Sequence, residues 1–204
     1  MKKALSQKVL RYHKWRAGAN PPLKILMAFV FACFTGMMAQ LSINLTWTPV
    51  PLTGQSFAVM LSAVFLGVTG GLSQVMYVAL GFAGIPWFAN GKGGVAVIYG
   101  PTAGYLYAFI ITAFLIGYCI DRYPRMRAFF PLLSLMISLH FIVILGLGSV
   151  YLWIWTKVVK GAGMDFSKLI LMTVYPFIGG TIIKSALAAA IGHILCPQND
   201  WRVR

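Results

Sequence analysis

Lys184 is the side chain in this sequence that points most clearly to chemistry, because it is a charged residue inside an apolar segment. It lies in the last hydrophobic stretch, residues 176–195, and no other charged residue lies as far inside such a segment. A lysine near the middle of a membrane helix costs roughly 2.5–3.5 kcal/mol on insertion scales, so a functional site is the default hypothesis. The alternative is a lysine that snorkels to the interface. Its stem would then have to cover about 12 Å of helix back to Pro176, about twice its own length.

The residues before Lys184 favour an anion as its partner. Pro176 suits the first turn of a helix, and Gly179 and Gly180 weaken the regular helix after it. Thr181 can accept hydrogen bonds from free N–H groups and lies three residues before Lys184, on the same helix face. A helix start, a hydroxyl and an ammonium group close together suit a carboxylate. This stretch therefore predicts a substrate site with Lys184 and Thr181 as contacts.

The composition places the chain among integral membrane proteins. Of its 204 residues 59% are hydrophobic and 10% are charged, whereas a soluble domain carries about 25% charged residues. The net charge of +14 comes from basic residues before the first apolar segment, in residues 121–127 and at the C-terminal end. This pattern is typical of the positive-inside rule rather than of a groove that follows nucleic-acid phosphates. We expect membrane lipids around the chain, no nucleic-acid partner, and both termini in the cytoplasm.

Enzyme motifs and metal-ligand patterns are absent from the sequence. The three cysteines have no metal-ligand spacing, and Gly-x-Ser-x-Gly, His-Glu-x-x-His and paired carboxylates within apolar segments are all missing. His140 and His193 each stand alone on an apolar segment, and we interpret both as packing residues or polar contacts. A membrane-embedded enzyme is the rival class of function. We expect a protein that is not an enzyme, with no catalytic residue, no metal site and no cofactor.

Hydropathy divides the chain into an arm, a membrane domain and a tail. Residues 1–24 form a basic cytoplasmic arm, residues 25–195 a six-helix substrate-binding domain, and residues 196–204 a short cytoplasmic tail. The expected fold is all-α. Its six transmembrane helices are residues 25–43, 56–68, 72–84, 102–120, 130–153 and 176–195. The second and third are short for a hydrocarbon core of about 30 Å, so either they tilt or the next loop lies at membrane depth.

That loop, residues 85–105 between the third and fourth helices, is predicted to be a re-entrant or capping segment over a pocket. It is rich in glycine, and irregular backbone at membrane depth is tolerated only where it is buried or lines a cavity. Asn90 lies in it, and we favour a ligand contact for its side chain. Gln55, before the second helix, either contacts a ligand or caps a loop. Tyr105 either closes the pocket with its ring or packs within the bundle.

A stripe of small residues runs along the first helix. Ala28, Ala32 and Gly36 recur every four residues, a spacing that lets another helix approach closely. Two interpretations stay open. The stripe either docks a partner protein or packs against another helix of the same bundle.

Three stretches, in this order along the chain, resemble those of one known family. They are Pro49–Leu61 (PVPLTGQSFAVML), Leu80–Phe109 (LGFAGIPWFANGKGGVAVIYGPTAGYLYAF) and Tyr175–Ala190 (YPFIGGTIIKSALAAA). The combination of Pro-Val-Pro-x-Thr-x-Gln with Gly-Pro-Thr-x-Gly-Tyr is specific. The sequence resembles the BioY family, the biotin-binding S-components of bacterial energy-coupling-factor (ECF) vitamin transporters. The match spans most of residues 28–195.

The resemblance implies a fold, a substrate and partners. Family members are six-helix proteins of the bacterial cell membrane that capture biotin from outside, and separate subunits supply the ATP-driven step. These partners are a coupling subunit and two ATPases. Ala28 and Ala32 match an Ala-x-x-x-Ala pattern by which the family docks its coupling subunit, and Asn90 matches a position that lines the pocket.

The last motif departs from the family pattern. The family usually has Pro-Phe-x-Pro-Gly-Asp-x-x-Lys where this chain has Gly179-Gly180-Thr181 before Lys184. The hydroxyl of Thr181 can hydrogen-bond a ureido group but brings no charge. Biotin is therefore the expected substrate, and another carboxylate such as a biotin precursor is the alternative.

Overall fold

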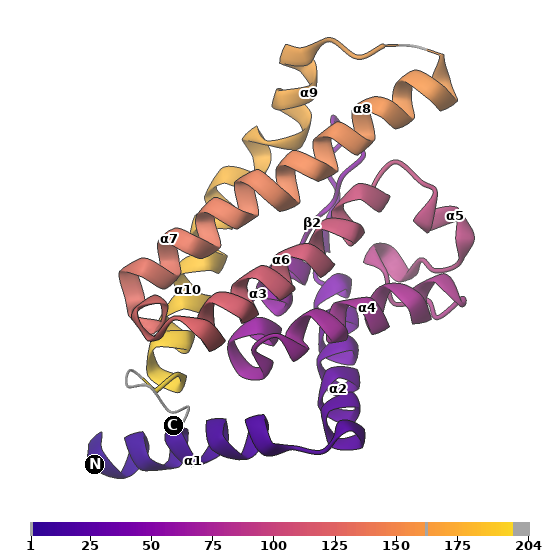
Figure 1. The fold of residues 1–204 in the computed structure, drawn as a ribbon. Coiled ribbons are helices and arrows are strands. Elements are labelled where there is room, and N and C mark those ends of the chain that lie inside the picture. The colour runs from indigo at the N-terminus through magenta and orange to yellow at the C-terminus, as the bar shows by residue number, and fades with distance from the viewer. Residues whose placement is uncertain (1, 162, 198–204) are drawn as a thin grey trace.

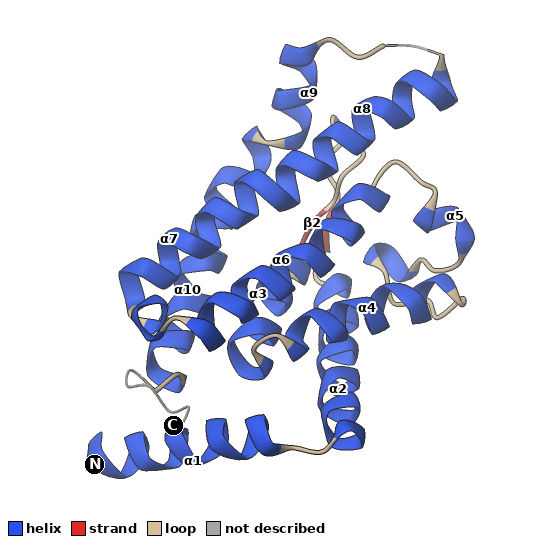
Figure 2. Ribbon diagram, in the orientation of Figure 1, coloured by secondary structure: helices blue, strands red, loops and turns tan. Residues whose placement is uncertain are grey.

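The computed structural model describes residues 2–161 and 163–197, and it is mostly helical (Figures 1 and 2). The helices and strands, in chain order, are α1 Lys2–Gly18, α2 Pro21–Gln40, β1 Ser42–Ile43, β2 Leu52–Thr53, α3 Gln55–Leu66, α4 Thr69–Phe82, η1 Ala89–Gly91, α5 Val95–Ile98, α6 Ala103–Arg122, η2 Pro124–Arg127, α7 Phe129–Leu139, η3 His140–Leu145, α8 Gly146–Lys160, α9 Phe166–Thr173, η4 Tyr175–Phe177 and α10 Ile178–Leu195. The tail predicted for residues 196–204 lies largely outside the described residues, which end at 197.

Four helical stretches in the described part of the chain are long and apolar enough to cross a membrane. They are Pro21–Gln40, Ala103–Arg122, Phe129–Lys160 and Phe166–Leu195. The second and third predicted spans correspond to α3 and α4, which have 12 and 14 residues. At 1.5 Å per residue these helices cover about 20 Å, less than the roughly 30 Å of a hydrocarbon core. The length of the helices therefore supports a membrane protein with four clear spans, and the count of six stays a prediction.

The helices form one bundle around α6. Figure 1 shows α7, η3 and α8 as one long continuous element, with α10 behind it and α2 on the far side of the bundle. The helix α6 contacts α3, α4 and α8, whereas α7 packs mainly on α10 and α2 on α4. The helix α1 lies crosswise under the lower end of α2 (Figure 1). The small antiparallel pair β1–β2 after α2 was not predicted, because each strand has only two residues.

Glycines allow α6 and α8 to lie very close together. A Cβ atom on Gly148 would come within 2.3 Å of the Tyr105 ring, and a Cβ on Gly104 within 2.3 Å of Tyr151. On each helix a glycine therefore contacts a tyrosine side chain of the other helix. Because any larger residue at either glycine would collide with a ring, these two contacts set the register of α8 on α6.

Hydrogen bonds close the end of the bundle where α1 lies. Arg16 of α1 forms an ion pair with Asp121 at the end of α6, with 2.5 Å between Nη2 and Oδ1. The other carboxylate oxygen of Asp121 accepts a hydrogen bond from the backbone N–H of Val68, between α3 and α4. Arg127 is fully buried and donates to the carbonyls of Ile120, Asp121 and Pro197. These bonds fasten the N-terminal arm, the α3–α4 turn, the end of α6 and the end of α10 to one another.

Candidate functional site

A cavity of about 470 Å³ opens near the opposite end of the bundle. This volume lies in the range of roughly 300–1,000 Å³ that is usual for small-molecule sites. Five parts of the chain wall it: the β1–β2 hairpin with the start of α3, the loop 85–105, α6, η3 and α10. The lining residues used below are Thr53, Gln55, Phe88, Asn90, Lys92, Tyr105, Phe109, His140, Ile144, Phe177 and Lys184. The loop 85–105 therefore does wall a cavity, as its glycine content predicted.

Lys184 reaches this cavity from α10. Its side chain is half-buried, and its ammonium group donates to the backbone carbonyl of Thr53 in β2 over 3.1 Å. Among the described residues the ion pair that forms joins Arg16 to Asp121. Lys184 therefore has no carboxylate partner among them. An ammonium group carries three donor hydrogens, and the carbonyl takes one of them. Lys184 can therefore offer the other two to a ligand in the cavity.

Gln55 lies on the cavity wall, but its amide is already engaged by neighbours. Its Nε2 donates to the Tyr77 hydroxyl over 2.8 Å, and its Oε1 accepts from the Thr53 hydroxyl over 2.8 Å. The Tyr77 hydroxyl in turn donates to the carbonyl of Trp87 in the loop. Gln55 thus joins α3, α4 and the loop beside the carbonyl that Lys184 contacts, and its contact with a ligand stays a prediction.

Asn90 fastens the loop 85–105 to the hairpin at the cavity mouth. Its backbone has φ +62°, a left-handed conformation in which asparagine is enriched. The side-chain amides of Asn90 and Asn44 exchange two hydrogen bonds, of 3.0 and 3.1 Å, and the Ser42 hydroxyl donates to Asn90 over 2.9 Å. We call this contact the Asn44–Asn90 clasp. Both asparagines are exposed and line the cavity, so the clasp lies at the solvent-facing side of the cavity.

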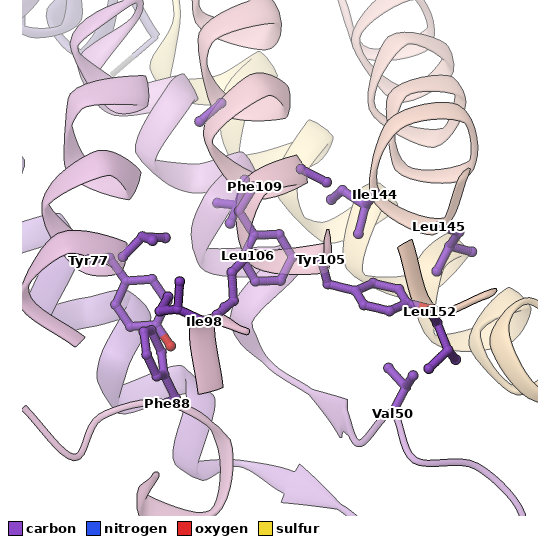
Figure 3. Packing of buried hydrophobic residues seen from close by; sticks show 14 of the residues in the cluster. Val50, Tyr77, Phe88, Ile98, Tyr105, Leu106, Phe109, Ile144, Leu145 and Leu152 are labelled. Carbon is purple, nitrogen blue, oxygen red and sulfur yellow. The ribbon is translucent and has the colours of Figure 1, made fainter. Parts of the chain in front are cut away.

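Tyr105 packs between α6 and α8 and also lines the cavity, whereas closure of the pocket by its ring stays a prediction. Its ring lies on the close approach to Gly148, and Figure 3 shows it extending from α6 toward Leu152. The same ring also lines the cavity. Phe88, Leu106 and Phe109 belong to the same apolar cluster (Figure 3), so much of the surface near the cavity suits an apolar ligand body.

Thr181 is the predicted contact that the structure does not bring to the cavity wall. It is 1% exposed and absent from the lining, and its hydroxyl is buried with no hydrogen-bond partner among the described residues. The prediction that Thr181 lies at the same site as Lys184 rested on their spacing of three residues along one helix. Lys184, however, reaches the cavity through its long side chain, whereas the short side chain of Thr181 stays between helices.

The stripe of small residues on α2 is buried inside the bundle. Ala28 and Ala32 are 0% exposed, and a Cβ on Gly36 would lie 3.1 Å from the Trp87 side chain. The helix α2 packs on α4 along this length. The burial favours packing within the bundle, the second of the two interpretations left open, over a docking surface in this conformation.

His140 is a cavity residue that the sequence analysis assigned to packing or polar contacts. It lines the cavity together with Lys184, although its side chain is 2% exposed overall. The sequence feature that could have identified His140 is the one that identified Lys184, a polar side chain deep in an apolar segment. It was weaker because a lone histidine carries no obligatory charge.

Comparison with known proteins identifies the family. A model of the BioY family matches residues 10–199 of the chain. The chain belongs to the BioY family. The resemblance drawn from the three sequence stretches is thereby confirmed.

Curated relatives in the BioY family cover most of the chain. A protein of Methanothermobacter thermautotrophicus named probable biotin transporter BioY is 42% identical over 142 residues, which are 69% of this chain and 90% of that protein. The biotin transporter BioY of Thermotoga maritima is 36% identical over 169 residues, which are 82% of this chain and 92% of that protein.

A solved structure has the same fold. It is a crystal structure at 2.1 Å of the S-component for biotin from an ECF-type ABC transporter. The TM-score is 0.76 with 24% sequence identity, and the alignment covers 90% of this chain and 97% of that one. At this level of identity the similarity establishes the fold of the bundle.

Proposed function

We propose that this chain is the membrane subunit that captures biotin for uptake, with ATP supplied by separate proteins. The family membership and the biotin transporters among its relatives support the substrate. The observation that carries the proposal is a cavity of about 470 Å³ that combines apolar walls with the half-buried ammonium group of Lys184, which lacks a carboxylate partner among the described residues. Such a cavity matches a ligand with an apolar body and one anionic group.

In this proposal the carboxylate of biotin pairs with Lys184. A ligand carboxylate leaves water on binding, so it needs a compensating charge and hydrogen bonds. Lys184 holds one hydrogen bond to Thr53 and has two donors left for the ligand. Gln55 and Tyr105 supply neutral surface along the wall, and the Asn44–Asn90 clasp covers the mouth. The hydroxyl of Thr181 has no part in this arrangement unless α10 turns.

Replacing the ammonium group tests the pairing. Lys184→Met keeps an apolar stem and should weaken biotin binding by roughly 10- to 100-fold, since charge-assisted hydrogen bonds are worth about 1.5–3 kcal/mol. Binding of radiolabelled biotin to the purified protein measures the effect. A biotin amide, which has no anion to lose, should be affected much less, so acid and amide on both proteins form a double-mutant cycle. If Lys184→Met weakened binding of the acid and of the amide equally, Lys184 would not be the partner of the carboxylate. Lys92 would then be the next candidate.

We further propose that the chain crosses the bacterial cell membrane six times, with both termini in the cytoplasm. The basic residues of the arm and of residues 121–127 favour this orientation. The short helices α3 and α4 then lie within the bundle, and the loop 85–105 enters the membrane from outside as a cap. A membrane-impermeant thiol reagent should fail to label single cysteines at positions 3, 125 and 203 in intact cells. Efficient labelling there would overturn the six-span orientation.

The partners of this subunit follow from the same proposal. We expect a coupling subunit and two ATPases, which matches the type of transporter named for the S-component with the same fold. Co-purification of the chain with a tagged coupling subunit from the same cell tests this. Full uptake of biotin by cells that express this chain alone would show that it works without them.

A further inference from the structure

The long element Phe129–Lys160 contains a π-helical segment beside the cavity. Residues His140–Leu145 form η3, between α7 and α8. A π-helix closes its hydrogen bonds between residues five apart, so it inserts an extra residue into an α-helix. Such segments are rare and occur often at functional sites. Three of the six residues of η3, His140, Ile144 and Leu145, line the cavity.

The two helices that flank the π-segment pack on different partner helices. The helix α7 lies on α10, where Leu132 and Met136 are buried and Leu132 faces Gly192. The helix α8 lies on α6, where Gly148 receives the Tyr105 ring. Each half is thus held in register by a different partner helix. The π-segment lies where one partner helix gives way to the other.

The His140 side chain lines the cavity and has no hydrogen-bond partner among the described residues. The Nδ1 atom of His140 is buried and has no hydrogen-bond partner among the described residues. The side chains of His140 and Lys184 line the same cavity. A buried polar group without a partner is destabilising, so a ligand that hydrogen-bonds this ring would be favoured.

We infer that His140 is a second ligand contact, which together with Lys184 forms a two-point polar subsite for a flat group with two adjacent polar atoms. A carboxylate has this shape, with one oxygen for the ammonium group and one for the imidazole. A neutral imidazole offers one N–H donor and one acceptor nitrogen, and the hydrogen bond made by one nitrogen sets the role of the other. The subsite therefore discriminates against ligands that carry only one polar atom at this end. The inference rests on the proposed capture of biotin and names a residue that determines its selectivity.

Mutants at His140 and a biotin analogue test the inference. His140→Phe keeps an aromatic ring and removes both nitrogens, and it should weaken biotin binding about threefold to tenfold. Biotinol, in which an alcohol replaces the carboxylate, has one polar atom at that end. The wild type should prefer biotin over biotinol, and His140→Phe should lose a large part of that preference. His140→Gln, which restores a hydrogen-bonding group, should bind biotin more tightly than His140→Phe does.

Controls separate a ligand contact from a packing role. Phe141→Leu changes the next residue of η3, which does not line the cavity, and should leave the preference for biotin unchanged. In a Lys184→Met background the cost of His140→Phe should shrink, because both residues contact the same group. Equal weakening of biotin and biotinol by His140→Phe, or full additivity with Lys184→Met, would overturn the inference.

A measurement on the unmutated chain keeps the inference testable even if His140→Phe does not fold. The chain has three histidines. With histidine labelled by a heavy nitrogen isotope, biotin should shift the nuclear magnetic resonance signals of the His140 ring and leave those of His13 and His193 in place. An unchanged His140 signal in a protein that binds biotin overturns the inference alone. A protein that does not bind biotin overturns the proposed function instead.

Discussion

Arg127 and Lys184 lie at opposite ends of the bundle, and the protein surrounds them differently. Arg127 is 0% exposed, and three backbone carbonyls accept its hydrogen bonds. Lys184 is half-buried and has one carbonyl, that of Thr53. The guanidinium of Arg127 is thus satisfied from within the chain, whereas the ammonium group of Lys184 has donors to spare.

The difference distinguishes a structural cation from one available to a ligand. Around Arg127 the hydrogen bonds tie η2 to the ends of α6 and α10, and nearby Asp121 neutralises Arg16. Around Lys184 the described cavity wall includes apolar side chains, the engaged amide of Gln55 and the imidazole of His140, and it contains no carboxylate. Burial alone would have pointed to Arg127 as the more unusual residue. The completeness of its hydrogen bonding shows that it holds the fold together instead.

The largest expected effect separates the two ends by stability. Arg127→Met should lower the free energy of unfolding by about 3 kcal/mol or more, because it leaves buried carbonyls without donors at about 1–3 kcal/mol each. Thermal unfolding in detergent measures the loss. The folded fraction of this variant should bind biotin as the wild type does, whereas Lys184→Met should lose binding and keep its stability. A stable Arg127→Met protein with weakened biotin binding would contradict the comparison.

The next effect lies between the two ends, on α2. Ala32 is 0% exposed, so Ala32→Leu should overpack the contact of α2 with α4 and cost about 1–3 kcal/mol. We expect the melting temperature and biotin binding to fall together. Ala28→Gly serves as the control for a loss of bulk on the same buried face. Should Ala32→Leu instead bind biotin normally and block uptake in cells, the stripe would be a docking surface for the coupling subunit.

The third prediction concerns the clasp at the cavity mouth. Asn90→Gly removes the side chain but tolerates the φ of +62°, so it isolates the hydrogen bonds from backbone strain. It should speed dissociation of biotin several-fold, since each lost hydrogen bond is worth about 0.5–1.5 kcal/mol. Asn44→Ala should do the same, and the double variant should be little worse than either single one. Additive effects would mean that the two asparagines act separately rather than as a clasp.

The smallest effect is a pH dependence at the end of the bundle where α1 lies. Burial, followed by the charge of Arg16, lowers the pKa of His13 to about 4, from an ordinary value of about 6.5. Between these two values the unfolded chain binds a proton that the folded chain excludes, so stability is lost as the pH falls from about 6.5 to 4. The melting temperature of the wild type should fall more steeply over this range than that of His13→Gln. If the melting temperatures of the wild type and of His13→Gln fell equally steeply with pH, His13 would not cause the pH dependence.

Several features of this protein follow from the sequence alone. The scarcity of acidic residues and the apolar runs determined that it is a helical membrane protein, because unpaired charge is excluded from lipid. The glycines of residues 85–105 predicted an irregular wall segment. Hydropathy also singled out Lys184, because a single charged residue in an apolar segment can be recognised from the sequence without the fold. Three motifs in the right order identified the family.

The tertiary structure decided which neighbours each of these residues has. Hydropathy already showed that the second and third helices are short, but it could not show that α3 packs on α6 and α4 on both α2 and α6. Helical spacing placed Thr181 beside Lys184, but the way α10 packs leaves Thr181 between helices and only Lys184 at the cavity. His140 lies at the cavity because η3 connects α7, which packs on α10, with α8, which packs on α6. Such competition between contacts far apart in the chain leaves no local signature, so only the folded structure reveals it.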